Sequence, residues 1–167
     1  MGKTCAFLGN DYDFMRGRKR ERRPRFMVKE QVKEQIVKLI ETEGVTDFLV
    51  GEIGGYEEDA YDAVLEVKQN YPDIHITLVI SKITELHPIG EDNPKHVYAG
   101  KYCDDFIYPD KSAMGYKRLS IVYRNRFIIE NTDFIIAYNE YQGRAYEFCK
   151  KARNKGVKII ELSEIYN

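Results

Sequence analysis

The segment 123–147 holds the residues of this chain that are best suited to chemistry. Arg124 and Asn125 are adjacent in one apolar helical pattern, while Arg144 and Glu147 stand three positions apart in a later one. An arginine can bind a phosphate or a carboxylate through two parallel N–H donors. A carboxylate can serve as an acid, a base or an acceptor for a ribose hydroxyl. These residue types predict a site for a phosphorylated ligand.

Both arginines also have a purely structural interpretation. Arg124 could form an ion pair with a nearby aspartate or glutamate, and Arg144 could pair with Glu147 across one helical turn. The sequence leaves these alternatives open, and it does not decide whether the protein catalyses a reaction. If it does, Arg124 and Glu147 are the candidate catalytic residues.

Three turns that contain glycine follow apolar runs, at residues 9–11, 51–55 and 139–144. Glycine lets backbone N–H groups approach a phosphate closely, and the start of a following helix adds a favourable dipole. The alternative is a tight strand-to-helix turn without a ligand. From these turns we predict the ligand-binding residues Gly9, Asn10, Gly51, Glu52, Gly55, Gly143 and Arg144, which join Arg124, Asn125 and Glu147.

The second turn carries an objection to this prediction. Carboxylates crowd the turn, and they would repel a phosphate while stabilising the first turn of a helix by themselves. A phosphate bound nearby needs compensating cations, for which Arg124 and Arg144 are the candidates. The crowding carboxylates are Glu52, Glu57, Glu58 and Asp59.

The elements that would position these residues alternate between strands and helices. Continuous apolar runs predict buried strands, and apolar residues at helical spacing predict amphipathic helices. Such alternation is typical of an α/β fold, here a Rossmann-like three-layer α/β/α sandwich with a mostly parallel sheet, in one domain over 1–167. We expect strands at 3–8, 46–50, 74–80, 105–108, 134–138 and 157–162, helices at 28–43, 56–71, 115–131 and 144–155, and a long loop at 81–104.

The composition is that of a globular protein, with 43% hydrophobic and 32% charged residues and a net charge of −1. No apolar run approaches the roughly 20 residues that span a bilayer, and the N-terminus lacks a signal-peptide layout, so no membrane partner is expected. Three scattered cysteines without metal-binding spacing indicate reduced thiols in the cytoplasm. His87 and His96 flank two acids in a pattern that matches no metal site, and we expect neither a metal nor a cofactor.

A basic run, residues 16–25, holds seven arginine and lysine residues against one glutamate. Such a run can bind nucleic acid through its phosphates. It could also cover a phosphorylated ligand, because it follows the first glycine turn, or it could be a solvated loop without a partner.

Three stretches of the chain, KTCAFLGN, GVTDFLVGEIGGYEEDA and YRNRFIIENTDFIIAYNEYQGRAYEFCKKARNKGVKIIEL, resemble the SLOG superfamily of Rossmann-like proteins. The greatest resemblance is to the small bacterial proteins of the YpsA and YoqJ type. The superfamily includes the LOG phosphoribohydrolases, which cleave the N-glycosidic bond of a nucleoside monophosphate with a helical Arg and the Glu of a PGGxGTxxE motif. Arg124, Gly143 and Glu147 fall on matching positions. Four positions of that motif differ: Asn139, Glu140, Tyr141 and Arg144 replace Pro, Gly, Gly and Thr.

The resemblance implies a pocket for a nucleotide or a nucleotide-derived phosphorylated ligand at the carboxyl edge of the sheet. One alternative is a nucleoside-monophosphate N-glycosidase, in which Arg124 holds the phosphate and Glu147 stabilises positive charge on the sugar. Another is a nucleic-acid-associated protein that uses residues 16–25. The apolar helix 116–131 could pack on a second copy, which would make the protein a homodimer.

Overall fold

The computed structural model describes residues 2–12, 23–81, 96–98, 101–109 and 117–167. A six-stranded sheet forms its centre, in the order β6-β3-β2-β1-β7-β8, and every neighbouring pair is parallel. The predicted Rossmann-like α/β fold is therefore confirmed. The strands are β1 (Lys3–Gly9), β2 (Val45–Val50), β3 (His75–Val79), β6 (Asp105–Ile107), β7 (Phe134–Tyr138) and β8 (Lys158–Glu161).

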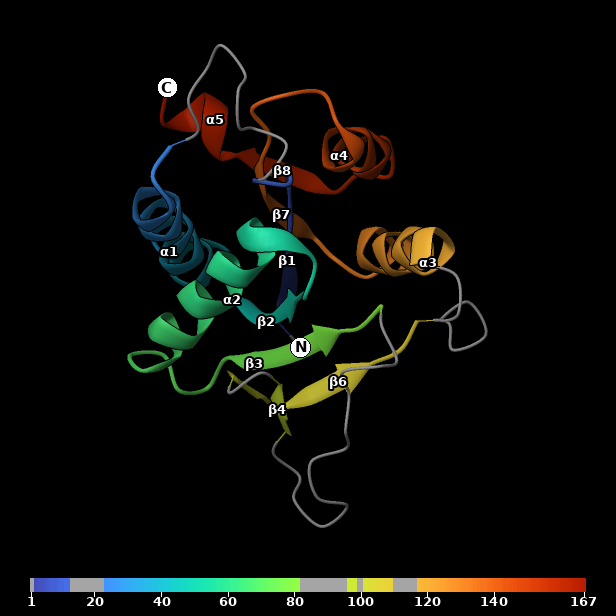
Figure 1. The fold of residues 1–167 in the computed structure, drawn as a ribbon. Coiled ribbons are helices and arrows are strands. Elements are labelled where there is room, and N and C mark those ends of the chain that lie inside the picture. Colours follow the sequence, from blue (N-terminus) through green and yellow to red (C-terminus); the bar gives the residue numbers. More distant parts are fainter. Residues whose placement is uncertain (1, 13–22, 82–95, 99–100, 110–116) are drawn as a thin grey trace.

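Helices cover both faces of this sheet (Figure 1). One face carries α1 (Arg25–Glu43) and α2 (Gly54–Lys68), and the other carries α3 (Lys117–Glu130) and α4 (Arg144–Asn154). Successive residues of a strand point to opposite faces, so β1 contributes to two separate apolar cores. Phe7 packs in the core beneath α1 and α2, whereas Ala6 and Leu8 pack in the core beneath α3 and α4. Burial on both faces explains why the strands are continuous apolar runs.

The strand order places a reversal beside β1. The chain first builds outward from β1 through β2 and β3 to β6, and then returns to place β7 on the opposite side of β1. The connections that leave β1 and β7 therefore diverge to opposite faces at the carboxyl ends of these strands. In open α/β sheets this switch point is where ligands bind.

Glycine marks the end of α1. Gly44 has a φ of 70° and donates its N–H to the carbonyl oxygen of Leu39. This left-handed conformation suits glycine because it lacks a Cβ atom. The turn leads directly into β2, and the predicted boundary between helix and strand is confirmed.

The expectation of a loop throughout 81–104 was wrong in part. Two short strands, β4 (His96–Tyr98) and β5 (Lys101–Cys103), form an antiparallel pair there. Each strand has three residues, which is too short for an alternating pattern to be recognised in the sequence. The short helix α5 (Leu162–Ile165) after β8 was also not predicted, and the Glu161 side chain caps it by accepting from the Ser163 N–H.

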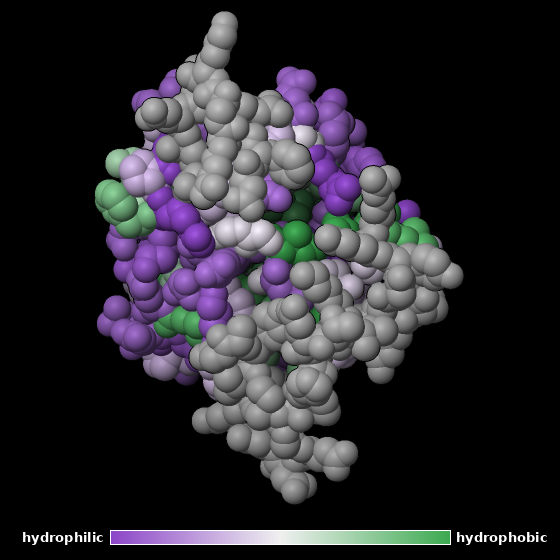
Figure 2. All heavy atoms as spheres, in the orientation of Figure 1, coloured by the Kyte–Doolittle hydropathy of each residue, from purple (hydrophilic) through white to green (hydrophobic). Residues whose placement is uncertain are grey.

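The surface view in Figure 2 shows a coloured face in which hydrophilic residues predominate and green areas are small. The large hydrophobic side chains exposed in the described residues are Phe26, Met27, Leu119 and Ile165. Within the same residues, no helix combines the length and the apolar character needed to cross a bilayer.

Candidate functional site

A cavity of about 360 Å³ lies at the switch point, beyond the carboxyl ends of β1 and β7. Its walls come from the end of β1, the start of α2, one face of α3 and the loop that opens α4. The cavity brings together six of the ten predicted ligand-binding residues, which are Gly9, Asn10, Arg124, Asn125, Gly143 and Arg144. The other lining residues are Leu8, Asp11, Ile53, Gly54, Glu57, Ile121, Tyr141 and Ala145.

The remaining predicted residues lie elsewhere. Gly51, Glu52 and Gly55 line a neighbouring cavity of about 590 Å³, which shares Asp11 and Gly54 with the first. The Glu52 carboxylate accepts a hydrogen bond from the Ser81 hydroxyl at 2.7 Å.

Glu147 lines neither of these two cavities. Its exposed carboxylate lies 3.7 Å from Lys150 Nζ, and the structure shows no pair between Glu147 and Arg144. Glu147 thus does not line the cavity that Arg124 lines, although the sequence placed both in one site.

A buried ion pair between Arg124 and Glu57 spans the two helix layers across the edge of the sheet. Arg124 lies on α3 with 1% exposure, and Glu57 lies in the first turn of α2 with 5% exposure. The guanidinium contacts both carboxylate oxygens, with Nη2 at 2.8 Å from Oε2 and Nη1 on Oε1. Two parallel N–H···O bonds make this the strongest geometry for such a pair. The structural interpretation of Arg124 is therefore the one observed, with Glu57 as a partner that the sequence did not single out.

Asn125 completes the coordination of this guanidinium. Its Oδ1 accepts from Arg124 Nε at 3.1 Å and from Nη2 at 2.6 Å. Arginine can only donate, so the oxygen of the amide must face Arg124 and the nitrogen must face away. The Asn125 side chain is buried, at 4% exposure, and lines the cavity. Its Nδ2 has no acceptor among the described residues, which is unusual for a buried donor.

Further donors converge on the same cavity from α4. No side chain caps this helix: its N-cap is Gly143, and the first intrahelical bond runs from Glu147 N to the Gly143 carbonyl oxygen. The N–H groups of the first turn are therefore available for an anion. Arg144 is exposed at the cavity wall and makes no ion pair or hydrogen bond with any described residue.

The glycines at this edge make room for side chains of the protein itself. A Cβ atom on Gly51 would lie 1.8 Å from Glu57 Oε1 and 2.4 Å from Arg124 Nη1, so the ion pair requires glycine there. A Cβ on Gly9 would lie 2.3 Å from the ring of Tyr56. At both positions the missing side chain thus makes room for another side chain of the protein, while the contact of these glycines with a ligand stays a prediction.

Two further glycines follow the same rule. A Cβ on Gly55 would come within 2.5 Å of the Tyr12 ring, and one on Gly143 within 2.6 Å of the Tyr141 ring. Gly54 differs from them. It has a φ of 78°, no described atom lies within 4 Å of its hypothetical Cβ, and it forms part of both cavity walls.

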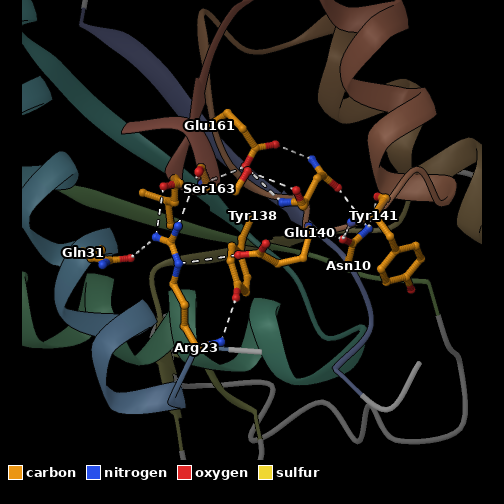
Figure 3. A network of polar contacts seen from close by, with 10 residues as sticks. Asn10, Arg23, Gln31, Tyr138, Glu140, Tyr141, Glu161 and Ser163 are labelled. Atoms are coloured by element: carbon orange, nitrogen blue, oxygen red, sulfur yellow. Dashed lines mark hydrogen bonds and ion pairs between the residues drawn. The ribbon is translucent and has the colours of Figure 1, made fainter. Parts of the chain in front are cut away.

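Asn10 holds the loop between β7 and α4 in place (Figure 3). Its Oδ1 accepts from the backbone N–H groups of Glu140 and Tyr141, at 2.6 and 3.0 Å. Its Nδ2 donates to Asn139 Oδ1 and to the Tyr141 carbonyl oxygen, both at 3.2 Å. Asn10 was predicted as a ligand contact, and here its amide positions the loop that forms one cavity wall.

The basic run contributes two arginines to this framework. Arg23 donates to the carbonyl oxygens of Leu162 and Ser163. Its Nε lies 3.5 Å from Glu140 Oε1, and Figure 3 shows the two side chains pointing toward each other. Arg25 makes two hydrogen bonds to the Asp59 carboxylate, at 2.7 and 3.0 Å. Both guanidinium groups are thus engaged within the protein. Residues 16–22, and with them most of the predicted nucleic-acid arm, lie outside the described residues.

Burial raises the pKa of three side chains near this edge. Desolvation raises the pKa of the Tyr138 phenol to about 12 and that of the Cys149 thiol to about 12. Burial, followed by the Asp59 carboxylate, raises the pKa of Tyr12 as well. A thiolate is the reactive form of cysteine, so this pKa shift works against a nucleophilic role for Cys149. The described residues also contain no group of three or more His, Cys, Asp or Glu side chains that could hold a metal ion.

Comparison with known protein families identifies the family of this chain. The model of the YspA SLOG family, YpsA, matches residues 18–161. The chain belongs to this family. The matched range includes α2, α3 and the start of α4, which carry Glu57, Arg124 and Arg144. A search of curated proteins found none that matches the chain.

Proposed function

We propose that this SLOG protein binds a nucleotide, or a nucleotide-derived phosphorylated ligand, in the cavity of about 360 Å³. The observation that carries the proposal is the convergence of unused donors on this cavity. These donors are the buried Asn125 amide nitrogen, the Arg144 guanidinium and the uncapped first turn of α4. A phosphate offers only acceptor oxygens and negative charge, and it therefore satisfies all three.

The rest of the cavity suits the organic part of a nucleotide. Leu8, Ile53 and Ile121 supply apolar wall, and Tyr141 adds an aromatic ring. The volume falls within the range of about 300–1,000 Å³ that is usual for small-molecule sites. Membership of the SLOG family supports a nucleotide-related ligand.

The phosphate is assigned here to Arg144 and Asn125 rather than to Arg124. Glu57 neutralises the Arg124 charge, and Asn125 and Glu57 together occupy donors on all three guanidinium nitrogens. A phosphate at Arg124 would have to displace a buried carboxylate, which costs the energy of leaving that charge unpaired. Arg144 carries no such competitor among the described residues.

Isothermal titration calorimetry with a panel of nucleoside mono- and diphosphates tests the proposal. Arg144→Gln and Asn125→Asp should each weaken binding about 10- to 100-fold, because each removes a hydrogen bond to a charged group, worth roughly 1.5–3 kcal/mol. Arg153→Gln is the matched control, since Arg153 is exposed at the other end of α4. Absence of binding by the wild type, or an equal loss in the control, would refute the proposal.

A further inference from the structure

We infer that Glu57 accepts a hydrogen bond from a sugar hydroxyl of the ligand and that Arg124 is its positioning residue. This inference rests on the proposed function, and it assigns a role to a residue that was not among the predicted ligand contacts. It has a direct consequence for specificity: the site should distinguish ribonucleotides from their deoxy counterparts.

The first step is a count of hydrogen bonds at the carboxylate. An ionised carboxylate can accept about four. Glu57 Oε1 accepts from Arg124 Nη1 and from the Ile53 N–H at 3.3 Å, while Oε2 accepts only from Arg124 Nη2 in the described part of the chain. Glu57 is buried and lines the cavity. One acceptor position on Oε2 is thus left for a donor that the ligand brings.

The second step concerns which ligand group can supply that donor. A carboxylate only accepts, so it cannot bond an ionised phosphate, whose oxygens also only accept. Sugar hydroxyls and base N–H groups are the donors of a nucleotide. The sugar is joined directly to the phosphate, and the cavity that holds Glu57 also holds the phosphate donors Asn125 and Arg144. A hydroxyl therefore reaches the carboxylate before a base edge does.

The third step is the part played by Arg124. Its charge cancels that of Glu57, so a carboxylate can remain in a cavity that receives a phosphate. Its two bonds to Asn125 Oδ1 also direct the Asn125 nitrogen away from the ion pair. Arg124 thus acts on the ligand through its two neighbours, because acceptors already engage donors on each of its nitrogens.

The test compares each nucleoside 5′-monophosphate that binds the wild-type protein with its 2′-deoxy and 3′-deoxy forms by calorimetry. At least one deoxy form should bind about 10-fold or more weakly, the loss expected for a hydrogen bond to a charged group. Replacing Glu57 alone would leave Arg124 buried and unpaired, so the variant joins Glu57→Leu, which has no hydrogen-bond acceptor, to Arg124→Met. In this double variant the ratio of the two affinities should fall to about one. Glu130→Gln on α3 should keep the wild-type ratio, since Glu130 is exposed and lines neither cavity of the site.

The outcomes separate the inference from the proposed function. Equal affinity for the ribonucleotide and both deoxy forms overturns the inference and leaves nucleotide binding intact. Discrimination that persists in the double variant also overturns it, because the hydroxyl is then read elsewhere. If Glu57 is needed for discrimination between bases but not between ribose and deoxyribose, the donor is a base N–H group, and the inference is overturned. Absence of binding by every nucleotide overturns the proposed function as well.

Discussion

The buried ion pair between Glu57 and Arg124 should make a large and strongly coupled contribution to stability. Both side chains are almost completely removed from water, at 5% and 1% exposure, so loss of either leaves an uncompensated buried charge. Such a loss typically costs about 3–5 kcal/mol, whereas removing both charges together costs far less. We therefore expect Arg124→Met and Glu57→Gln each to destabilise the protein by about 3–5 kcal/mol, and the double variant by no more than about 2 kcal/mol.

Guanidinium chloride unfolding followed by circular dichroism measures these free energies and closes the double-mutant cycle. The control is Glu130→Gln, which removes an exposed pair with Lys155 at 3.6 Å and should cost less than about 1 kcal/mol. In a chain of 167 residues the single variants should also lower Tm by roughly 6–20 °C. Single losses below about 1 kcal/mol, or additive effects in the double variant, would refute the reasoning.

Two further predictions concern residues near the same edge. Gly51→Ala should destabilise the protein by about 1–3 kcal/mol through overpacking, and this loss of stability should shrink when the Glu57–Arg124 pair is also removed. The control is Gly44→Ala, whose cost comes from backbone strain at a φ of 70° and should be the same with and without the ion pair. Burial raises the Tyr138 pKa from 10.0 to about 12, so its contribution to stability is complete below the unfolded value and is lost as pH rises through this window. Tyr138→Phe should flatten the fall in stability between these pH values, as unfolding curves at stepped pH would show, and an unchanged slope would contradict the assignment.

Much of the fold could be predicted because its strands are buried on both faces. Runs such as residues 134–138 are continuously apolar, and the segments between them have apolar residues at helical spacing. The same pattern places every strand-to-helix turn at one edge. Where burial is partial or the element is short, as in β4, β5 and α5, the local pattern is too weak to reveal it.

The candidate site was predictable in position but not in its internal pairing. Arg124, Asn125, Gly143 and Arg144 do meet in one cavity. The sequence could not show that Glu57 would neutralise Arg124, because four carboxylates crowd the same turn and only one of them lies where the guanidinium reaches. Nor could it show that Glu147 faces Lys150 at the surface.

By itself, the sequence determined the longer helices and strands of this protein, because hydrophobic periodicity and glycine turns act over a few neighbouring residues. The tertiary structure alone decided what those elements bring together. Arg124 and Glu57 are 67 positions apart, and Asn10 and Asn139 are 129 apart. Such pairs depend on which strands become neighbours and on which face each helix packs, and those choices are made by the packing of the whole domain. The Asn125 Nδ2 donor, which has no partner among the described residues, also depends on this packing, because the buried guanidinium beside Asn125 fixes the direction of its amide.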